Sequence, residues 1–221
     1  MDEGRGRAAG STGRKNNRPG RPRAKNGRRP QLLEIARQVI SKTGYGAASM
    51  RTIGEHAGVT AAAFYNHFES KDELLGAIVL ESSERLIALL NTQVSQGGEP
   101  LQRLQNLIGA HIRFTCDNPE ATQIVLEEAR FLKAVDSAVA REKQRTILNI
   151  YCSCLTELQQ QGKLSDGNPT LCAFNIIAVI NGFYRWFRPG KRRSLDEVVN
   201  ATTRFILGGL LHPAEGLPTD V

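Results

Sequence analysis

The chain has 221 residues, 40% of them hydrophobic, and a formal net charge of +7. This length accommodates one sizeable domain, or a small domain beside a larger one. No uncharged apolar run reaches the roughly 18 residues of a membrane span, and the start of the chain lacks the apolar region of a secretory signal. The composition therefore argues against a membrane-spanning chain and predicts a soluble, cytoplasmic protein.

The positive charge is concentrated in residues 1–30, which hold 10 basic side chains against two acidic ones. The rest of the chain is nearly neutral, with 19 basic and 20 acidic side chains. Residues 1–29 are rich in Gly, Arg, Asn and Pro, and we expect this basic arm to be disordered by itself. A basic arm on a nearly neutral body indicates a polyanionic partner, either nucleic acid or an anionic membrane. A solvated leader without a function is the alternative.

Apolar residues at helical spacing begin after the arm, and the pattern predicts about nine helices. The first runs from Pro30 to Gly44. Two short helices follow at 49–57 and 60–68, each starting at a good N-cap, with Gly58 between them. The remaining six are predicted at 70–96, 101–116, 118–132, 136–161, 168–188 and 194–211. The chain shows neither the alternation typical of strands nor an internal repeat, so the predicted fold class is all-α.

The two short helices have the pattern of a helix-turn-helix. A turn of three or four residues that contains Gly allows a second helix to cross the first and lie in a DNA major groove. Two short helices around a Gly also occur in many helical bundles that do not bind DNA. The basic arm directly upstream favours DNA binding.

Four motifs follow one another within residues 30–75: Gly44–Ile53, Ala57–Thr60, Phe64–Phe68 and Lys71–Leu75. Together they resemble the N-terminal domain of TetR-family transcriptional repressors. The resemblance implies a helix-turn-helix DNA-binding domain at 30–75 and a larger helical ligand-binding and dimerisation domain at 76–221. It further implies a homodimer that binds a palindromic operator on double-stranded DNA and leaves it when a ligand binds.

The motif helices carry the candidate base contacts. Arg51 stands near the start of the first, where it can reach a base edge or a phosphate, and Arg paired with guanine is the commonest specific contact. Thr60 can cap the second helix and donate to a phosphate. Ala61 and Ala62 occupy positions where many relatives carry polar side chains, and their methyl groups can touch thymine without forming hydrogen bonds. Base recognition is therefore expected to depend on Arg51, Thr60 and the arm.

Tyr65, His67 and Lys71 match family positions that hold the DNA backbone. Each has a structural alternative: a half-buried core tyrosine, a packing histidine and an ordinary surface lysine. In the arm, Pro19–Arg23 resembles the Gly-Arg-Pro core of an AT-hook. That resemblance implies that Arg21 and Arg23 lie in a narrow A·T-rich minor groove.

The segment 175–183 is apolar almost all round, which is typical of a helix that is buried on every side. In TetR-family proteins the last two helices form a four-helix dimer interface, and the helix after Ser194 can pair with this segment. The predicted dimer residues are Asn175, Ala178, Val179, Gly182, Val199, Thr202, Phe205 and Ile206. A monomeric core is the alternative.

Tyr184–Gly190 and Ser194–Val198 resemble one branch of the family, whose repressors of fatty-acid and steroid catabolism respond to acyl-CoA thioesters. Such a ligand needs an apolar tunnel for its chain and cations for its phosphates. The candidate ligand-binding residues are Phe114, Ile124, Arg130, Phe131, Ile150, Phe183 and Arg188, and further candidates are Leu126, Arg185, Lys191, Arg192 and Arg193. The alternatives are a different hydrophobic small molecule, or an ordinary core that binds no ligand.

The four cysteines and four histidines show no zinc-ligand spacing, so we expect reduced thiols, no metal site and no cofactor. The chain contains no Gly-rich phosphate loop, nucleophile elbow or metalloprotease motif, and the adjacent Glu127 and Glu128 face different ways on a helix. The sequence therefore predicts a regulator and not an enzyme. The alternative function is an architectural DNA-binding protein that acts mainly through its basic arm, without an inducer.

Overall fold

The structure is a computed structural model that describes residues 28–165, 167–188, 190 and 193–211. These residues form helices and no strands, which confirms the all-α prediction. The elements are α1 (Arg29–Thr43), α2 (Met50–His56), α3 (Ala61–Tyr65), α4 (Lys71–Ser95), α5 (Pro100–Asp117), α6 (Pro119–Gln123), the π-helical segment η2 (Ile124–Glu128), the 3-10 segment η3 (Ala129–Phe131), α7 (Ala134–Gln160), α8 (Pro169–Asn181), α9 (Phe183–Trp186) and α10 (Leu195–Leu210). None of these helices is long and apolar enough to cross a membrane.

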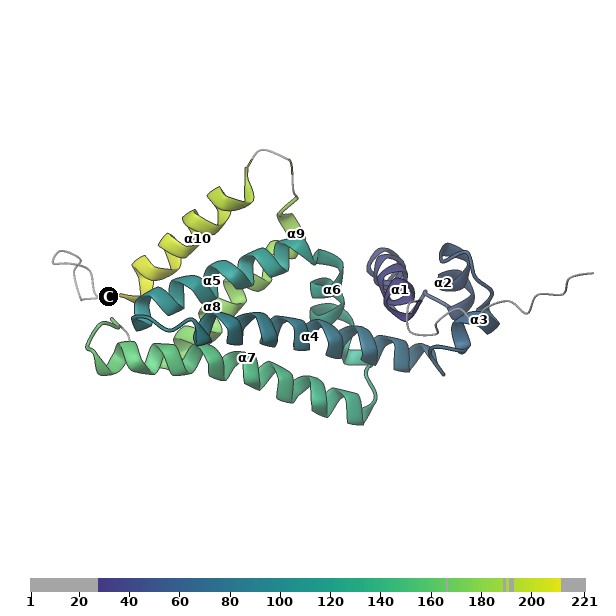
Figure 1. Ribbon diagram of the computed structural model, residues 1–221, viewed down its shortest axis with the longest axis horizontal. Coiled ribbons are helices and arrows are strands. Elements are labelled where there is room, and N and C mark those ends of the chain that lie inside the picture. Colours follow the sequence, from purple (N-terminus) through teal and green to yellow (C-terminus); the bar gives the residue numbers. More distant parts are fainter. Residues whose placement is uncertain (1–27, 166, 189, 191–192, 212–221) are drawn as a thin grey trace, which may run out of the picture.

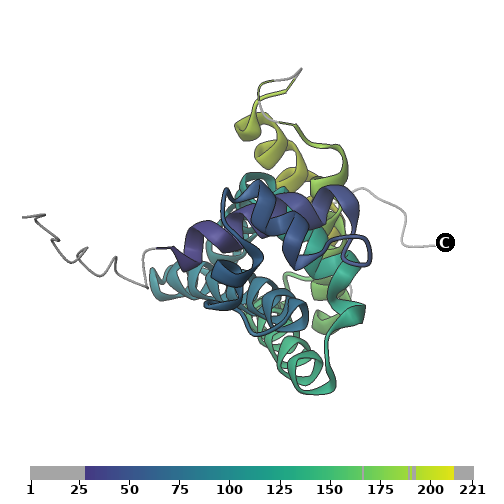
Figure 2. The ribbon, with the colours of Figure 1, turned by 90° about the vertical axis from the view of Figure 1, so that its right-hand side faces the viewer.

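The helices form two units that share α4 (Figure 1). The helices α1, α2 and α3 lie at one end, and Figure 2 looks directly onto that end. From there α4 runs into the larger unit, where it packs against α5 and α7, and α8 packs against α7. The last helix, α10, lies along α5 and is joined to it by an ion pair of 2.6 Å between Arg113 and Asp196.

Each unit has its own hydrophobic core, and α4 contributes to both. The core of the N-terminal unit includes Leu33, Ile40, Ile53, Phe64, Phe68, Leu74, Leu75, Ile78 and Ile124. The core of the C-terminal unit includes Leu90, Leu104, Leu107, Ile112, Tyr151, Leu155, Leu158, Ile176, Ile180 and Phe183. One continuous helix therefore carries side chains into both cores and connects the two units.

Side-chain caps set several helix starts, as the sequence predicts. The hydroxyl of Ser70 accepts a hydrogen bond of 3.1 Å from the N–H of Glu73 at the start of α4. The reciprocal bond of a capping box is shifted here by one residue, because the Glu73 carboxylate accepts from the N–H of Glu69. At α10 the box of Ser194 and Glu197 is complete, with bonds of 3.1 and 2.7 Å.

Three predicted helices differ in the structure. The helix predicted at 60–68 ends at Tyr65, because the chain bends there to place the rings of Phe64 and Phe68 side by side in the core, 5.5 Å apart. The helix predicted at 118–132 is divided into α6, η2 and η3, since the π-helical turn interrupts the regular helix. The helix predicted at 168–188 is broken at Gly182 into α8 and α9.

Candidate functional site

Two side-chain caps and a close approach of the α2 backbone to the following turn define the geometry of α2 and α3. Ser49 accepts a hydrogen bond of 3.0 Å from Thr52 N–H at the start of α2, and Thr60 accepts one of 3.1 Å from Ala63 N–H at the start of α3. A Cβ on Gly54 would lie 3.1 Å from the carbonyl oxygen of Val59, which is tighter than most Cβ contacts, so glycine favours this close approach of α2 to the turn. Gly58 has a φ of +62°, which glycine adopts without strain.

The predicted DNA-binding residues of α2 and α3 lie on the surface of this unit. The side chain of Arg51 is 83% exposed, and its only ion pair among the described residues is a solvent-exposed one of 3.7 Å with Glu55. Thr60 and Ala62 are exposed, Ala61 is half-buried, and Tyr65 is 51% exposed. Tyr65 is not part of the N-terminal core, and about half of its surface is covered.

Lys71 has a well-defined place within the N-terminal unit. Its ammonium group donates hydrogen bonds of 2.8 Å to the carbonyls of Tyr45 and Ala48 and lies 4.3 Å from the centre of the Tyr45 ring. The neighbouring Asp72 accepts a hydrogen bond from the Tyr45 hydroxyl, and this bond together with Lys133 lowers the pKa of the Asp72 carboxyl. These contacts fix the loop before α2 against α4, and they leave one of the three Lys71 donors for any phosphate.

His67 is half-buried near the start of α4. Arg21 and Arg23 lie outside the described residues, and so does nearly all of the predicted basic arm. The prediction that these residues contact DNA remains a prediction, as do the contacts assigned to Arg51, Thr60 and Lys71.

A cavity of about 500 Å³ opens in the C-terminal unit. Its size falls in the usual range of ligand pockets, roughly 300–1,000 Å³. Its lining comes from α4, α5, α6, η2, α7 and α8: Ser82, Ser83, Leu86, His111, Phe114, Thr115, Thr122, Val125, Leu126, Arg141, Gln144, Arg145, Ile147, Leu148, Phe174, Ile177, Ala178 and Asn181. Most of this lining is apolar, so the cavity suits a hydrophobic molecule.

The polar lining residues differ in exposure, and two sets of them matter for a ligand. Ser82, His111 and Thr115 are buried, and they form the part of the cavity that we call the floor. Arg141 and Arg145 are exposed and lie one helical turn apart on α7, at what we call the mouth. Burial lowers the pKa of His111 to about 4, so its imidazole is neutral near pH 7.

Of the seven predicted ligand-binding residues, only Phe114 lines this cavity, together with the further candidate Leu126. Ile124 is instead fully buried in the core of the N-terminal unit, because the π-helical turn directs it away from the cavity. Phe131 stacks on Tyr45 with ring centres 5.4 Å apart, and the guanidinium of Arg130 lies 4.9 Å from the Phe131 ring centre.

The other predicted ligand residues also lie elsewhere. Phe183 is buried in the C-terminal core, and Ile150 lines a separate pocket together with Arg103. Arg188 donates hydrogen bonds to the carbonyls of Tyr184 and Phe187, since it caps the end of α9. Lys191 and Arg192 lie outside the described residues. The sequence does contain a signal for the true lining: the pairs His111 with Thr115 and Arg141 with Arg145 are both spaced by four.

The segment η2 touches both units. Ile124 is buried in the N-terminal core, Val125 packs against that core and also lines the cavity, and Leu126 lines the cavity. Glu127 accepts a hydrogen bond of 2.6 Å from the Tyr184 hydroxyl, and its pKa is lowered chiefly by that bond. The carboxylate of Glu128 approaches Gly44 at the end of α1. A ligand that displaced Val125 or Leu126 would therefore push directly on the N-terminal unit.

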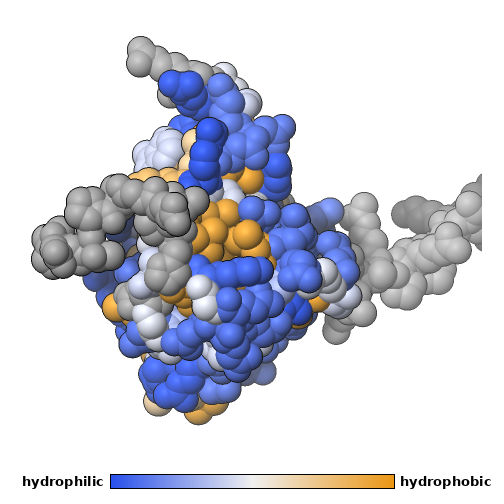
Figure 3. All heavy atoms as spheres, turned by 90° about the vertical axis from the view of Figure 1, so that its left-hand side faces the viewer, coloured by the Kyte–Doolittle hydropathy of each residue, from blue (hydrophilic) through white to orange (hydrophobic). Residues whose placement is uncertain are grey.

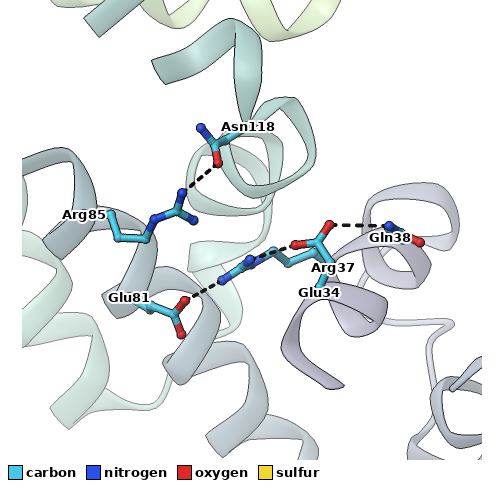
Figure 4. A network of polar contacts seen from close by, with 6 residues as sticks. All are labelled: Glu34, Arg37, Gln38, Glu81, Arg85 and Asn118. Carbon is cyan, nitrogen blue, oxygen red and sulfur yellow. Dashed lines mark hydrogen bonds and ion pairs between the residues drawn. The ribbon is translucent and has the colours of Figure 1, made fainter. Parts of the chain in front are cut away.

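A second connection between the units is polar, and it is drawn in Figure 4. The buried guanidinium of Arg37 on α1 pairs with Glu34 on the same helix and with Glu81 on α4, each at 2.9 Å. One turn further along α4, Arg85 donates a hydrogen bond of 3.3 Å to Asn118, directly before α6. The position of α1 is thus coupled to α4, and that of α4 to the start of α6.

The predicted dimer residues fall into two sets. Phe205 is 73% exposed, Val179 is 39% exposed, and Asn175 and Ala178 are exposed as well. Val199 and Ile206 are instead buried within the C-terminal core, and Gly182 and Thr202 are intermediate. Further apolar side chains of α8, Leu171 and Phe174, are about half exposed. Figure 3, which views the end opposite α1–α3, shows hydrophobic surface uncovered among hydrophilic residues.

The comparisons with known proteins agree with this architecture. Residues 32–78 match the model of bacterial regulatory proteins of the tetR family, and residues 97–210 match that of the tetracyclin repressor-like C-terminal domain. The transcriptional repressor KstR of Mycolicibacterium smegmatis is 30% identical, over 72% of this chain and 73% of the relative. The repressor KstR2 of Mycobacterium tuberculosis is 24% identical, over 84% of this chain and 94% of the relative.

Two solved structures share the fold. The ketosteroid transcriptional regulator KstR2 of Mycobacterium tuberculosis superposes with a TM-score of 0.78 at 25% identity, over 84% of this chain and 96% of that one. AibR, solved in complex with isovaleryl coenzyme A and operator DNA, has a TM-score of 0.74 at 23% identity, over 80% of this chain and 97% of that one.

Proposed function

Because the chain belongs to the TetR family of bacterial regulatory proteins, we propose that it is a homodimeric repressor that leaves a palindromic operator when a hydrophobic ligand fills its cavity. It is a DNA-binding transcriptional regulator and not an enzyme. The two recognition helices of a dimer would occupy successive major grooves, about one helical turn or more apart.

The observation that supports ligand control most directly is the position of η2. Consecutive residues of this short segment face the N-terminal core and the cavity, so the two sites share a mechanical element. Release of DNA requires that the ligand bind one arrangement of the units better than the other. Displacement of Val125 and Leu126 would shift Ile124, and with it α1 and α4, and so would change the spacing of the two recognition helices.

For the ligand class we favour an acyl-CoA thioester. The apolar walls suit an acyl chain, and Arg141 and Arg145 at the mouth supply cations for the phosphates of coenzyme A. The cations proposed to bind the phosphates are therefore Arg141 and Arg145 on α7, in place of Arg188. A protein of the same fold, AibR, holds isovaleryl coenzyme A, which supports this class. A different hydrophobic small molecule remains the second candidate.

Exposed apolar surface on α8 and α10 supports the proposed dimer. Among the predicted interface residues, Phe205 and Val179 expose apolar surface to water. A partner subunit that packed on them would remove this surface from water. Leu171 and Phe174 would extend the same contact along α8. Val199 and Ile206 would stabilise α10 from inside rather than touch the partner.

A mobility-shift assay on the DNA upstream of the protein's own gene tests the proposal. The complex is titrated with a long-chain acyl-CoA and, in parallel, with the free fatty acid. Release by the thioester alone supports the acyl-CoA class, release by both supports another hydrophobic ligand, and a complex that survives both contradicts ligand control by these molecules.

Footprinting of the same fragment separates repression from the architectural alternative. A repressor protects one discrete palindrome, because two recognition helices define two half-sites. An architectural protein that binds through its arm would coat A·T-rich DNA without a defined boundary. The latter pattern would contradict the proposed function.

A further inference from the structure

The floor of the cavity contains buried polar groups that have no partner in the described part of the chain. Ser82 is 4% exposed and Thr115 is 1% exposed, and neither hydroxyl forms a hydrogen bond with any described residue. Their neighbours differ, because Ser83 donates to the carbonyl of Val79 at 2.9 Å and Thr122 donates to the carbonyl of Asn118 at 3.0 Å. Because Ser82 and Thr115 both line the cavity, their hydroxyls are available to hydrogen-bond to a molecule that fills it.

His111 is the third floor residue, and its hydrogen bonds determine which ring nitrogen carries the proton. The Tyr151 oxygen lies 3.1 Å from His111 Nδ1 and 3.2 Å from the carbonyl oxygen of Leu107. A carbonyl can only accept, so the single proton of Tyr151 goes to Leu107. Both contacts are hydrogen bonds only when the Tyr151 oxygen accepts from His111, and this arrangement assigns the imidazole proton to Nδ1.

The second ring nitrogen of His111 is therefore an acceptor. A neutral imidazole carries one N–H, and burial keeps this imidazole neutral near pH 7. With the proton on Nδ1, Nε2 presents a lone pair, and no described residue donates to it. His111 is 2% exposed and lines the cavity, one turn from Thr115 on the same face of α5. The floor thus combines one obligate acceptor with two hydroxyls that can donate or accept.

From this arrangement we propose that the cavity selects a hydroxylated lipid, whose apolar body carries a hydroxyl group at the end that reaches the floor. The hydroxyl donates to Nε2 of His111 and accepts from Ser82 or Thr115, so the floor groups find partners. A keto group satisfies only the hydroxyls and leaves Nε2 unpaired, and a plain hydrocarbon end satisfies none of them. This inference rests on the proposed ligand-binding function and specifies the chemistry of that ligand.

The mouth defines the other end of the same molecule. Arg141 donates to the Ser137 hydroxyl at 2.6 Å, and Arg145 pairs with Glu142 at 3.6 Å, both at exposed positions where solvent weakens such contacts. An anionic group on the ligand can therefore recruit either guanidinium. A fatty acid with a hydroxyl far from its carboxylate has both features.

Titration calorimetry of the full-length protein tests the inference with three probes of one carbon skeleton. They are decanoic acid and its hydroxyl and keto derivatives, each substituted at the carbon next to the terminal methyl. We expect the hydroxyl derivative to bind about tenfold more tightly than either of the others, the scale of one buried hydrogen bond that the other probes cannot form. Equal affinities for the three probes, or tighter binding of the keto derivative, would overturn the inference.

Variants connect the preference to the floor. His111→Phe should abolish the preference for hydroxyl over keto, and Thr115→Val should reduce it. Thr146→Val is the matched control, because the Thr146 hydroxyl already donates to the carbonyl of Glu142 and does not line the cavity. We expect Thr146→Val to keep the wild-type preference. An unchanged preference in both floor variants would contradict the assignment.

An NMR measurement on the wild-type protein tests the same assignment without relying on the folding of variants. The ¹⁵N resonance of His111 Nε2 should lie at the position of an unprotonated nitrogen and should move when the hydroxyl probe is added, but not with decanoic acid. A protonated Nε2 would overturn the inference. If none of the three probes binds while a long-chain acyl-CoA still releases operator DNA, this inference fails and the proposed ligand control stands. If neither the probes nor the acyl-CoA binds while the protein still shifts operator DNA, the proposed ligand control fails as well.

Discussion

The two cores of the protein differ in how completely side chains fill them. In the N-terminal unit, Phe64 and Phe68 are almost completely buried and stack on each other, and Lys71 satisfies two carbonyls of the loop before α2. In the C-terminal unit, α4, α5, α7 and α8 enclose a cavity of about 500 Å³ whose floor carries hydroxyls unpaired within the described residues. The filled core holds the DNA-binding helices in one arrangement, whereas the hollow one leaves room for a ligand to change the packing.

The strongest contrast is expected between two phenylalanine truncations. Phe64→Ala removes a fully buried ring from the filled core and should lower the free energy of unfolding by about 3–5 kcal/mol. Phe114→Ala removes a half-buried ring from the cavity wall and should cost no more than about 1–2 kcal/mol, because this ring buries less apolar area. Urea unfolding of both variants measures the difference. Equal decreases would show that the two cores are equally well packed.

Substitutions on the surface of the N-terminal unit are expected to change DNA binding without changing stability. Arg51→Ala should weaken operator binding by about 1–3 kcal/mol and relax base preference if Arg51 contacts a base. Its 83% exposure and weak ion pair predict almost no change in thermal stability. Binding to the footprinted operator and to base-substituted operators distinguishes the two cases. A uniform decrease in affinity on every sequence would make Arg51 a phosphate contact instead.

The hollow unit is expected to carry a stability term that depends on pH. His111 has a pKa of about 4 in the folded protein against 6.5 for an unperturbed histidine, so the unfolded chain binds the extra proton between these values. The contribution is fully present above pH 6.5 and decreases as the pH falls toward 4, by about 2 kcal/mol at pH 5. Unfolding of the wild type and of His111→Phe at pH 7 and pH 5 measures it. The same pH dependence in both proteins would refute this origin.

The basic arm should contribute the smallest and least specific effect. Deletion of residues 1–28 should weaken operator binding and flatten its dependence on salt, by about 0.9 in the logarithmic slope for each phosphate that the arm neutralises. A matched variant replaces only Arg21 and Arg23 by alanine and tests the AT-hook resemblance. A salt slope that is unchanged by the deletion would remove the arm from the DNA interface.

The same contrast explains what could be predicted from the sequence. The helix-turn-helix depends on local chemistry, namely the caps at Ser49 and Thr60 and the glycines at positions 54 and 58, and such signals lie within a few residues of the structure that they set. The cavity depends on which faces of distant helices meet. Apolar residues at helical spacing identify a buried face without saying whether it meets a side chain or an empty space.

The ligand residues show where this limit lies. Ile124 and Leu126 stand two apart in one predicted helix, so their side chains point about 200° away from each other, and the first lies in the N-terminal core while the second lines the cavity. Ile150 and Phe183 are candidates only through their apolarity, and each lies elsewhere in the C-terminal unit. The spacing of four places His111 and Thr115 on one helix face, but the sequence does not tell whether that face meets a packed wall or a cavity, because this depends on how α4 lies opposite.

Ligand affinity measured with and without operator DNA tests the coupling of the two units most directly. Coupling between two sites is reciprocal, so a ligand that weakens DNA binding must itself bind more weakly to the DNA complex, by the same factor. Calorimetric titration of a long-chain acyl-CoA into the free protein and into its operator complex should give dissociation constants that differ by about 5- to 150-fold. Equal dissociation constants would show that the filled and hollow cores act independently, and would contradict ligand control of DNA binding.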